Sequence, residues 1–219
     1  MMNSEEKRNS VKRNYDLVAQ QYGKDFGIFI EDMDIYKAFE RELPKGATIL
    51  DLGAGTGRTY AYFSKRGYGY IGLDFSSKMR REAFRIHGEF AYICDDMVNV
   101  KNHFKNDSAD AIFAVYSLFH LPQDDFCRVL SDAHDILKDN GIIVLSYQLG
   151  AGEEFADEPY LGEKGKKALY MNYQADGEVE AILESLGFMD IYKKKKVETV
   201  DGAINGNNAT TVFRIMRKL

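Results

Sequence analysis

Cysteine, proline and long apolar stretches are all scarce in this sequence. Its 219 residues include 3 prolines and two cysteines, Cys94 and Cys127, which stand far apart and form no Cys-x-x-Cys pair. That pattern argues against a disulfide framework and against a structural zinc site. No apolar run approaches the length of a membrane span, and the first residues are polar rather than a secretory signal. We therefore expect reduced thiols, no membrane association and a cytoplasmic location.

An excess of positive charge is absent as well. The chain carries 29 Lys and Arg residues against 34 Asp and Glu residues, a net charge of -5. This balance gives no electrostatic reason for binding a polyanion. No basic segment interleaved with aromatic residues, of the kind that stacks on bases, occurs along the chain. Nucleic acid is therefore not an expected partner.

The sequence does contain a regular alternation of strand and helix patterns, which is typical of a single α/β domain. Strand patterns lie at about 47–52, 68–73, 89–94, 109–115, 141–147, 188–196 and 210–217. Helical patterns lie near 4–22, 35–43, 57–66, 76–87, 123–138 and 177–186. Strands separated by helices predict a parallel sheet with right-handed crossovers. The last two strands, joined by a turn-rich segment, predict an antiparallel pair.

The stretch Ile49-Leu-Asp-Leu-Gly-Ala-Gly-Thr-Gly-Arg58 is the strongest local signal. An apolar strand runs directly into three glycines spaced two apart, Gly53, Gly55 and Gly57. Glycines allow a sharp turn and a close approach of the backbone to a ligand. A dinucleotide site requires Gly-x-Gly-x-x-Gly, whereas Arg58 stands where the third glycine belongs, and no Gly-Lys-Ser/Thr of a phosphate loop follows. A nicotinamide-dependent oxidoreductase is therefore disfavoured, and Asp51 beside the loop suits a cationic ligand better than a pyrophosphate.

This segment resembles the first motif of the class I S-adenosylmethionine-dependent methyltransferases, small-molecule type. The resemblance implies a Rossmann-like, doubly wound and mostly parallel seven-stranded sheet with an antiparallel C-terminal hairpin strand, preceded by N-terminal lid helices. We expect one domain over residues 1–219. Its expected parts are N-terminal helices over 1–44, a cofactor-binding core over 45–148, a substrate loop over 149–173, and a C-terminal helix with antiparallel strands over 174–219.

An acidic residue closes the second predicted strand. Asp74 lies 19 positions after Gly55, where a carboxylate can accept hydrogen bonds from both ribose hydroxyls of a nucleoside. The competing interpretation is that Asp74 only caps the helix that begins near Ser76. The position after the glycine loop favours the ribose role. Phe75 and Met79 are then expected to supply apolar surface near the purine, although either also fits a core position.

A second acidic site follows the third strand. The segment Cys94-Asp-Asp-Met97 resembles the family's position that contacts the adenine amino group. The resemblance favours Asp96, followed by Met97, and leaves Asp95 as a competitor. Paired aspartates at the end of a strand also occur as plain turn residues.

The fourth strand ends in Ala114-Val-Tyr-Ser-Leu-Phe-His-Leu-Pro122, which resembles the Leu-His-His-Leu-type segment of small-molecule methyltransferases. In that family the backbone here faces the methionine part of the cofactor, which implicates Ser117 and Leu118. The Asn/Asp-Pro-Pro-Tyr/Phe arrangement associated with methylation of nucleic-acid bases and glutamine side chains is absent. His120 is the candidate general base, since an unperturbed histidine has a pKa of about 6.5. A hydrogen-bonded, partly buried side chain is the competing interpretation.

Aromatic residues supply the remaining candidates. Tyr15 and Tyr22 are seven positions apart on one helix face and resemble the family's Tyr-Asp-x-x-Ala-x-x-Tyr lid over the methionine end, although spacing alone also fits an ordinary amphipathic helix. The acceptor pocket is expected to involve tyrosines at strand ends and in the substrate loop, namely Tyr116, Tyr147, Tyr170 and Tyr173.

The resemblance implies transfer of a methyl group from S-adenosylmethionine to an O, N, S or C nucleophile of a small molecule by in-line displacement, with S-adenosylhomocysteine as product. We expect no metal cofactor and a monomer or homodimer. The alternative is a regulatory or partner module that binds S-adenosylmethionine or S-adenosylhomocysteine and has no methyl acceptor of its own.

Overall fold

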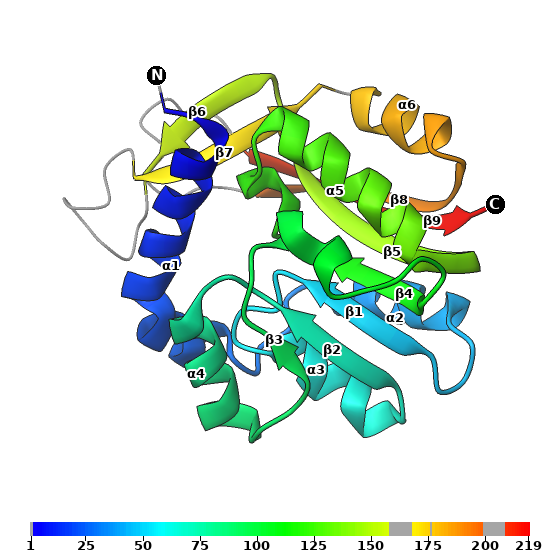
Figure 1. Ribbon diagram of the computed structural model, residues 1–219, viewed down its shortest axis with the longest axis horizontal. Coiled ribbons are helices and arrows are strands. Elements are labelled where there is room, and N and C mark those ends of the chain that lie inside the picture. Colours follow the sequence, from blue (N-terminus) through cyan, green and yellow to red (C-terminus); the bar gives the residue numbers. More distant parts are fainter. Residues whose placement is uncertain (1, 158–167, 176, 199–208) are drawn as a thin grey trace.

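The computed structural model describes residues 2–157, 168–175, 177–198 and 209–219, in which nine strands form one sheet (Figure 1). The strands are β1 (Thr48–Leu52), β2 (Gly69–Leu73), β3 (Tyr92–Ile93), β4 (Ala109–Ala114), β5 (Leu137–Leu149), β6 (Gly152–Ala156), β7 (Leu169–Gln174), β8 (Phe188–Glu198) and β9 (Ala209–Lys218). The order β3-β2-β1-β4-β5 is parallel, and β9 pairs antiparallel with both β5 and β8. The predicted α/β class and the seven predicted strands are confirmed.

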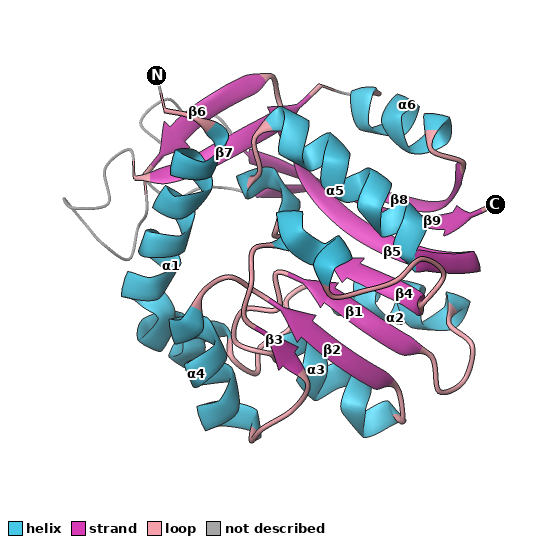
Figure 2. Ribbon diagram, in the orientation of Figure 1, coloured by secondary structure: helices cyan, strands magenta, loops and turns pink. Residues whose placement is uncertain are grey.

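Helices cover both faces of this sheet (Figure 2). They are α1 (Ser4–Phe26), α2 (Met33–Glu42), α3 (Arg58–Phe63), α4 (Ser77–His87), α5 (Gln123–Ile136) and α6 (Glu178–Ser185), with short 3-10 turns at Ser64–Arg66, Met97–Asn102 and Leu118–His120. Leu50 and Leu52 of β1 join the core under α5 and α6, whereas Ile49 joins the core under α2 and α3. Successive residues of a strand point to opposite faces, so a strand covered on both sides is apolar throughout. This explains why β1 reads as an apolar run.

The N-terminal helix α1 extends from the β6–β7 hairpin to α4 (Figure 1). It begins with a capping box, in which the Asn3 side chain accepts a hydrogen bond from the Glu6 backbone N–H and the Glu6 side chain accepts one from that of Asn3. Val18 and Ala19 in its C-terminal half pack against Met79 of α4. The helix therefore passes over the carboxyl ends of the central strands, where the candidate site lies.

The predicted substrate loop requires a correction. Residues Gly152–Ala156 and Leu169–Gln174 form the antiparallel pair β6–β7, and the end of β7 pairs in parallel with Gln148 and Leu149 at the end of β5. The inward positions of β7 include the polar residues Asn172 and Gln174, which hides the apolar alternation that marks a strand. The expected loop residues 158–167, and residues 199–208 of the turn-rich segment expected between the last two strands, lie outside the described residues.

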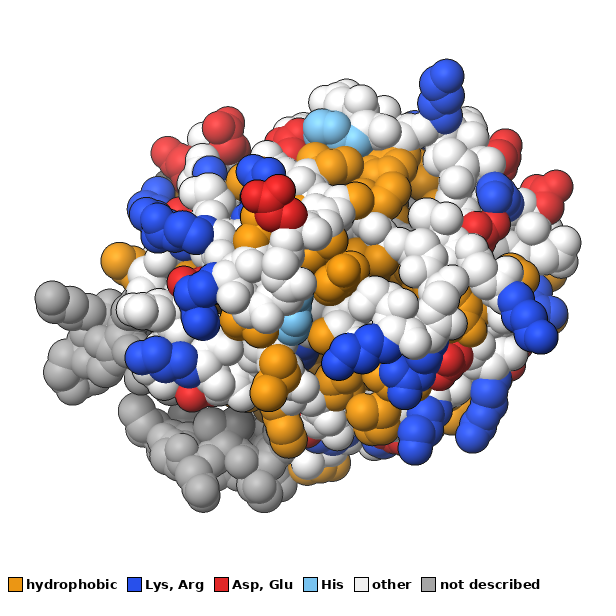
Figure 3. Space-filling model, turned by 90° about the horizontal axis from the view of Figure 1, so that it is seen from below, with side chains coloured by type: hydrophobic (Ala, Val, Ile, Leu, Met, Phe, Trp, Pro, Cys, Tyr) orange, Lys and Arg blue, Asp and Glu red, His pale blue; other side chains and the backbone are white. Residues whose placement is uncertain are grey.

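Charged and apolar side chains are mixed on the surface. Figure 3 shows one face on which Lys and Arg side chains lie scattered among apolar and acidic ones. Among the helices that the structure describes, none combines the length and apolar character needed to span a membrane.

Candidate functional site

The glycine loop after β1 forms the base of the site. Gly53, Gly55 and Gly57 have φ values of 89°, 50° and 78°, a region that residues with a side chain rarely adopt. At Gly53 the requirement is also steric, because an added Cβ would lie 2.4 Å from Cβ of Ser117. The loop therefore lies directly against the segment that follows β4.

Two adjacent hollows border this loop. The first hollow is lined by Arg8, Val11, Tyr15, Gly53, Asp74, Phe75, Asp96, Met97, Tyr116, Ser117, His120 and Leu121. The second hollow is lined by Tyr22, Asp51, Gly53, Ala54, Gly55, Thr56, Arg58, Thr59, Phe113, Val115 and Tyr116. Gly53 and Tyr116 border both, so the hollows meet there. They lie at the carboxyl ends of parallel strands, which is where open α/β sheets bind their ligands.

Asp74 lies in the first hollow and holds the glycine loop. Its Oδ2 accepts a hydrogen bond from the Gly55 N–H (3.0 Å), and its Oδ1 accepts one from the Ser76 N–H (2.8 Å). The cap of α4 is the Ser76 hydroxyl, which accepts a hydrogen bond from the Met79 N–H, so Asp74 is not the helix cap. Burial raises the pKa of Asp74 to about 6. A carboxylate in this position has unused lone pairs for ligand hydroxyls.

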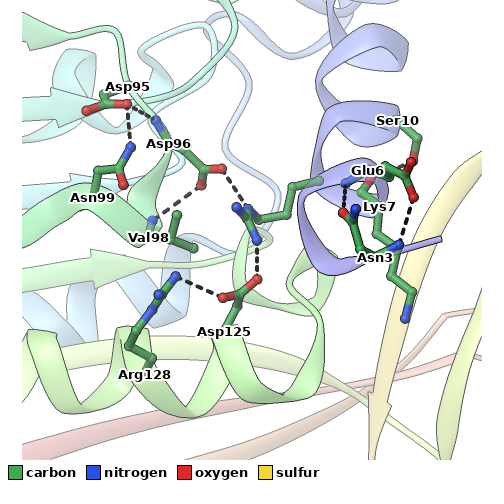
Figure 4. Close-up of polar contacts among 11 residues, drawn as sticks. Asn3, Glu6, Lys7, Ser10, Asp95, Asp96, Val98, Asn99, Asp125 and Arg128 are labelled. Atoms are coloured by element: carbon green, nitrogen blue, oxygen red, sulfur yellow. Dashed lines mark hydrogen bonds and ion pairs between the residues drawn. The ribbon is translucent and has the colours of Figure 1, made fainter.

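The two neighbouring aspartates after β3 point in different directions (Figure 4). Asp95 accepts hydrogen bonds from the Asn99 side chain (3.0 Å) and its Oδ2 lies 2.7 Å from Nε2 of His103. Asp96 lines the first hollow, and its Oδ2 accepts a hydrogen bond from Nε of Arg8 (2.7 Å). Of the two candidates, Asp96 is therefore the one that a ligand in the hollow can reach.

The second hollow brings a buried carboxyl group and a partly buried guanidinium together. Asp51 is 2% exposed, accepts a hydrogen bond from the Tyr70 hydroxyl (2.6 Å), and has its pKa raised to about 7 by burial. The Arg58 guanidinium lies 5.6 Å from the ring centre of Tyr116 and has no ion pair among the described residues. The Thr56 hydroxyl is buried and has no hydrogen-bond partner within the described part of the chain. This hollow thus offers a carboxyl group, a guanidinium and a hydroxyl.

Tyr116 separates the two hollows and is held under backbone strain. Its φ of 60° is uncommon for a residue with a side chain. The Tyr116 N–H donates a hydrogen bond to Oγ of Ser146 (2.7 Å), and its hydroxyl donates one to Asp32 (2.6 Å). These contacts fix the ring as a wall at the junction of the hollows.

His120 is buried, hydrogen-bonded through both ring nitrogens, and still part of the first hollow. Its Nδ1 lies 2.9 Å from the backbone carbonyl oxygen of Tyr170, and its Nε2 lies 2.8 Å from the Tyr15 hydroxyl. Because a carbonyl only accepts, Nδ1 carries the proton, and Nε2 accepts the hydrogen bond that Tyr15 donates. Burial lowers the pKa of His120 to about 4. The imidazole is therefore neutral at physiological pH, and its Nε2 is hydrogen-bonded to Tyr15 at the edge of the first hollow.

Several predicted site residues lie outside the surfaces of the two hollows. Met79, Leu118 and Tyr147 are at most 2% exposed and belong to packed cores, where Tyr147 also accepts a hydrogen bond from Arg214 (3.3 Å). Gly57 packs toward Phe90, which would lie 3.0 Å from an added Cβ. These residues support the walls of the site.

The two predicted loop tyrosines have different places. Tyr170 is buried behind His120, to which it presents its carbonyl oxygen. Tyr173 lines a separate groove with residues of β6 and α6. Burial is also the main cause that raises the pKa of Tyr173 to about 12. A position in the acceptor pocket remains a prediction for both.

The sequence interpretation missed Arg8 as a site residue. Arg8, Val11 and Tyr15 all line the first hollow and are spaced three and four residues apart, so they share one face of α1. Arg8 could have been found from its position, because it lies one helical turn before Val11 on the face that carries Tyr15. Its carboxylate partners are not apparent from the sequence.

Comparison with known proteins gives a consistent result. A family model described as a methyltransferase domain matches residues 49–141. Phosphoethanolamine N-methyltransferase 3 of Arabidopsis thaliana is 27% identical over 84 residues, 37% of this chain and 17% of that protein. Demethylmenaquinone methyltransferase of Tropheryma whipplei is 28% identical over 139 residues, 62% of this chain and 57% of that protein. The matched part thus spans less than two thirds of the length of these curated relatives.

The fold is also found in solved structures. One is the 1,6-didemethyltoxoflavin-N1-methyltransferase of Burkholderia thailandensis, with bound 1,6-didemethyltoxoflavin and S-adenosylhomocysteine. The TM-score is 0.71 at 16% identity, over 100% of this chain and 91% of that chain. At this identity the similarity concerns the fold.

Proposed function

We propose that this chain, in which residues 49–141 match a methyltransferase domain, is a class I S-adenosylmethionine-dependent methyltransferase that transfers the methyl group of S-adenosylmethionine to a small-molecule acceptor. The observation that carries this proposal is the pair of adjoining hollows with different polar groups. The first hollow presents the carboxylates of Asp74 and Asp96. The second presents Asp51 with Arg58. A nucleoside joined to an amino acid matches this arrangement.

In the proposed complex the first hollow holds the adenosine. The Asp74 carboxylate accepts hydrogen bonds from the ribose hydroxyls, while the Gly55 and Ser76 N–H groups keep it in place. Asp96 accepts a hydrogen bond from the adenine amino group. Phe75 and Met97 line the same hollow and supply apolar surface to the purine.

The second hollow is proposed to hold the amino-acid end of the cofactor. Asp51 there binds the ammonium group and Arg58 the carboxylate, with the Thr56 hydroxyl as an additional hydrogen-bonding group. Burial raises the pKa of Asp51 to about 7. The positive charge of a bound ammonium group would lower this pKa and so favour the ionised form. Asp51 and Arg58 thus complement the opposite charges of the ammonium and carboxylate groups of the cofactor's amino-acid end.

The reaction requires mainly orientation by the protein. S-adenosylmethionine supplies a methyl group that is already activated by the sulfonium, and the displacement is in line. Tyr116 and Gly53 border the junction of the two hollows and place the reacting atoms there. Orientation at near-attack distance contributes up to about 7 to 11 kcal/mol in favourable cases, and cover by α1 excludes water.

Tyr15 and His120 are proposed to remove the proton of an acceptor that arrives protonated. The phenolic oxygen of Tyr15 takes the acceptor proton, and the Tyr15 hydroxyl proton moves to Nε2 of His120 across the 2.8 Å hydrogen bond. Since the pKa of His120 is lowered to about 4, Nε2 is free to accept a proton throughout the neutral range. The strength of this base is correspondingly modest, which suits a readily deprotonated acceptor.

Calorimetric titration with S-adenosylmethionine and S-adenosylhomocysteine tests the proposal, with NADH as the control ligand. We expect micromolar binding of the first two and none of NADH, followed by formation of S-adenosylhomocysteine when candidate acceptors are supplied. Binding without turnover across a broad set of acceptors would favour the regulatory module. No binding of either S-adenosyl compound to protein freed of endogenous ligand would overturn the proposed function.

A further inference from the structure

Arg8 lies between two carboxylates from different parts of the chain. Its Nε donates a hydrogen bond to Oδ2 of Asp96, and its Nη1 donates one to Oδ2 of Asp125 in the first turn of α5. The Arg8 side chain is only 12% exposed and lines the first hollow. Figure 4 shows the Asp96 and Asp125 carboxylates turned toward α1. Arg8 therefore belongs both to the helix that covers the site and to the surface of the site itself.

The contacts of Asp96 leave room for a ligand. Its Oδ1 accepts a hydrogen bond from the Val98 N–H (3.3 Å), and its Oδ2 accepts the one from Arg8 (2.7 Å). Each carboxylate oxygen has two lone pairs, so each can accept one hydrogen bond more. The two existing bonds fix the rotation of the carboxylate. Arg8 thus prepares Asp96 as an acceptor for an amino group in the hollow.

Apolar and polar contacts hold α1 along its length, including burial of Val11 in its N-terminal half and a hydrogen bond from the Ser76 hydroxyl to Asp16 (2.6 Å) in its C-terminal half. Its C-terminal half packs on α4 through apolar contacts of Val18 and Ala19. Polar contacts hold its N-terminal half, namely those of Arg8, the Lys7–Glu153 ion pair (2.5 Å) and the hydrogen bond from the Asn14 side chain to the Ala168 carbonyl (2.5 Å). The hydrogen bonds of Arg8 are thus among the polar contacts that hold α1 against the first hollow.

We propose that Arg8 is a positioning residue that joins recognition of adenine to closure of α1. Through Asp96 it orients the acceptor of the adenine amino group, and through Asp125 it closes the helix over the nucleoside. The inference rests on the proposed function, because it requires an S-adenosyl ligand in the first hollow. It adds to that function a residue outside the matched domain segment that selects adenine.

The test compares two ligands that differ at the adenine amino group. S-Adenosylhomocysteine carries this group, whereas S-inosylhomocysteine has a carbonyl oxygen in its place. Calorimetry with both ligands gives a preference ratio for the wild type and for Arg8→Met. We expect the wild type to prefer the adenine ligand by about tenfold or more, as for a hydrogen bond to a charged group. In R8M the affinity for S-adenosylhomocysteine falls about tenfold and that for S-inosylhomocysteine by less than about threefold.

Arg128→Met is the matched control. Arg128 donates a hydrogen bond to the other oxygen of Asp125 (2.8 Å), but its side chain is 52% exposed and does not line the hollow. R128M therefore removes a cation from the same cluster without touching Asp96, and both affinities should remain within about twofold of wild type. Asp125→Asn separates the two roles of Arg8, since it should lower the affinity for both ligands by the same factor and leave the preference for the adenine ligand unchanged.

The outcomes are distinct. A fall in preference in R8M alone supports the role of Arg8. An equal loss for both ligands in R8M, or the same loss of preference in R128M, overturns it while leaving the proposed function intact. Failure of the wild type to bind either ligand overturns the proposed function and this inference with it. If R8M does not fold, Arg8→Lys gives the same test, because lysine keeps the charge but not the fork that reaches two carboxylates.

Discussion

Replacing Asp74 by asparagine should change the pH dependence of stability and weaken cofactor binding. Relative to the wild type, the unfolding free energy of the variant should be higher at neutral pH than at acidic pH. Asp74 is 8% exposed, and burial raises its pKa from 3.8 to about 6. A group whose pKa is higher in the folded state than in the unfolded state contributes stability below its unfolded pKa. That contribution is lost as the pH rises through the folded pKa. The amide that replaces this carboxyl in the variant is neutral throughout and lacks the dependence.

The magnitude follows from the two pKa values. The difference between 3.8 and about 6 corresponds to about 3 kcal/mol of unfolding free energy at neutral pH. Between about pH 4.5 and pH 7 the unfolding free energy of the wild type should fall relative to that of Asp74→Asn by about 2 kcal/mol. The affinity for S-adenosylhomocysteine should drop at least about tenfold in the variant, because a hydrogen bond to a charged group contributes about 1.5 to 3 kcal/mol.

Urea denaturation of both proteins across this pH range measures the effect. Asp95→Asn serves as the control, because the pKa of Asp95 is shifted in the opposite direction. Burial raises this pKa, but the hydrogen bonds with His103 and Asn99 outweigh burial and hold it below its ordinary value. A lowered pKa gives a contribution that is already present above the unfolded pKa, so the difference between wild type and D95N should stay nearly constant from about pH 4.5 to pH 7. A flat or opposite trend for Asp74→Asn, or unchanged cofactor affinity, would refute the reasoning.

Three further predictions concern the same site. Gly53→Ala should destabilise the protein by about 1 to 3 kcal/mol and abolish cofactor binding, because the added Cβ would meet a side chain at 2.4 Å. Thermal denaturation beside Gly46→Ala, where nothing lies within 4 Å, should show a smaller loss for the control. Tyr15→Phe should lower turnover about a hundredfold and leave S-adenosylhomocysteine affinity within about twofold of wild type. Product formation and calorimetry measure these two effects. Unchanged turnover would show that the Tyr15 hydroxyl takes no part in proton transfer. Since the pKa of Asp51 is about 7, the Kd of S-adenosylhomocysteine should rise about tenfold between about pH 7.5 and pH 6. The Kd of 5'-methylthioadenosine, which lacks the amino-acid end, should change about twofold at most. Parallel changes for the two ligands would contradict the role of Asp51.

The central part of the fold was predictable because its signals are local. Strands such as β1 and β4 are covered on both faces, so their sequences are largely apolar, and helices separate them at regular intervals. The position of a carboxylate at a strand end follows directly from this order. Asp51 and Asp74 therefore lie where the sequence indicated, beside the glycine loop.

Contacts between distant elements were not predictable in the same way. Helical periodicity indicates which side of α1 faces the protein, but it does not identify the partner of each residue. Arg8 meets Asp96 and Asp125, which are 88 and 117 positions away. The inward residues Asn172 and Gln174 of β7 likewise find their partner far away in the sequence, because both side-chain amides donate hydrogen bonds to the Gln123 side chain.

The missed hairpin has a direct effect on the chemistry of the site. From the sequence, His120 fits a buried, hydrogen-bonded side chain as well as a general base, and its contacts are compatible with both roles. Its Nδ1 is committed to the carbonyl of Tyr170 in β7, which leaves the basic nitrogen Nε2 facing Tyr15. Without β7 either tautomer would be available and the Tyr15 hydroxyl would have no fixed acceptor. The β6–β7 pair therefore determines which nitrogen can take a proton, and a variant that displaces Tyr170 should impair turnover although that side chain lines neither hollow.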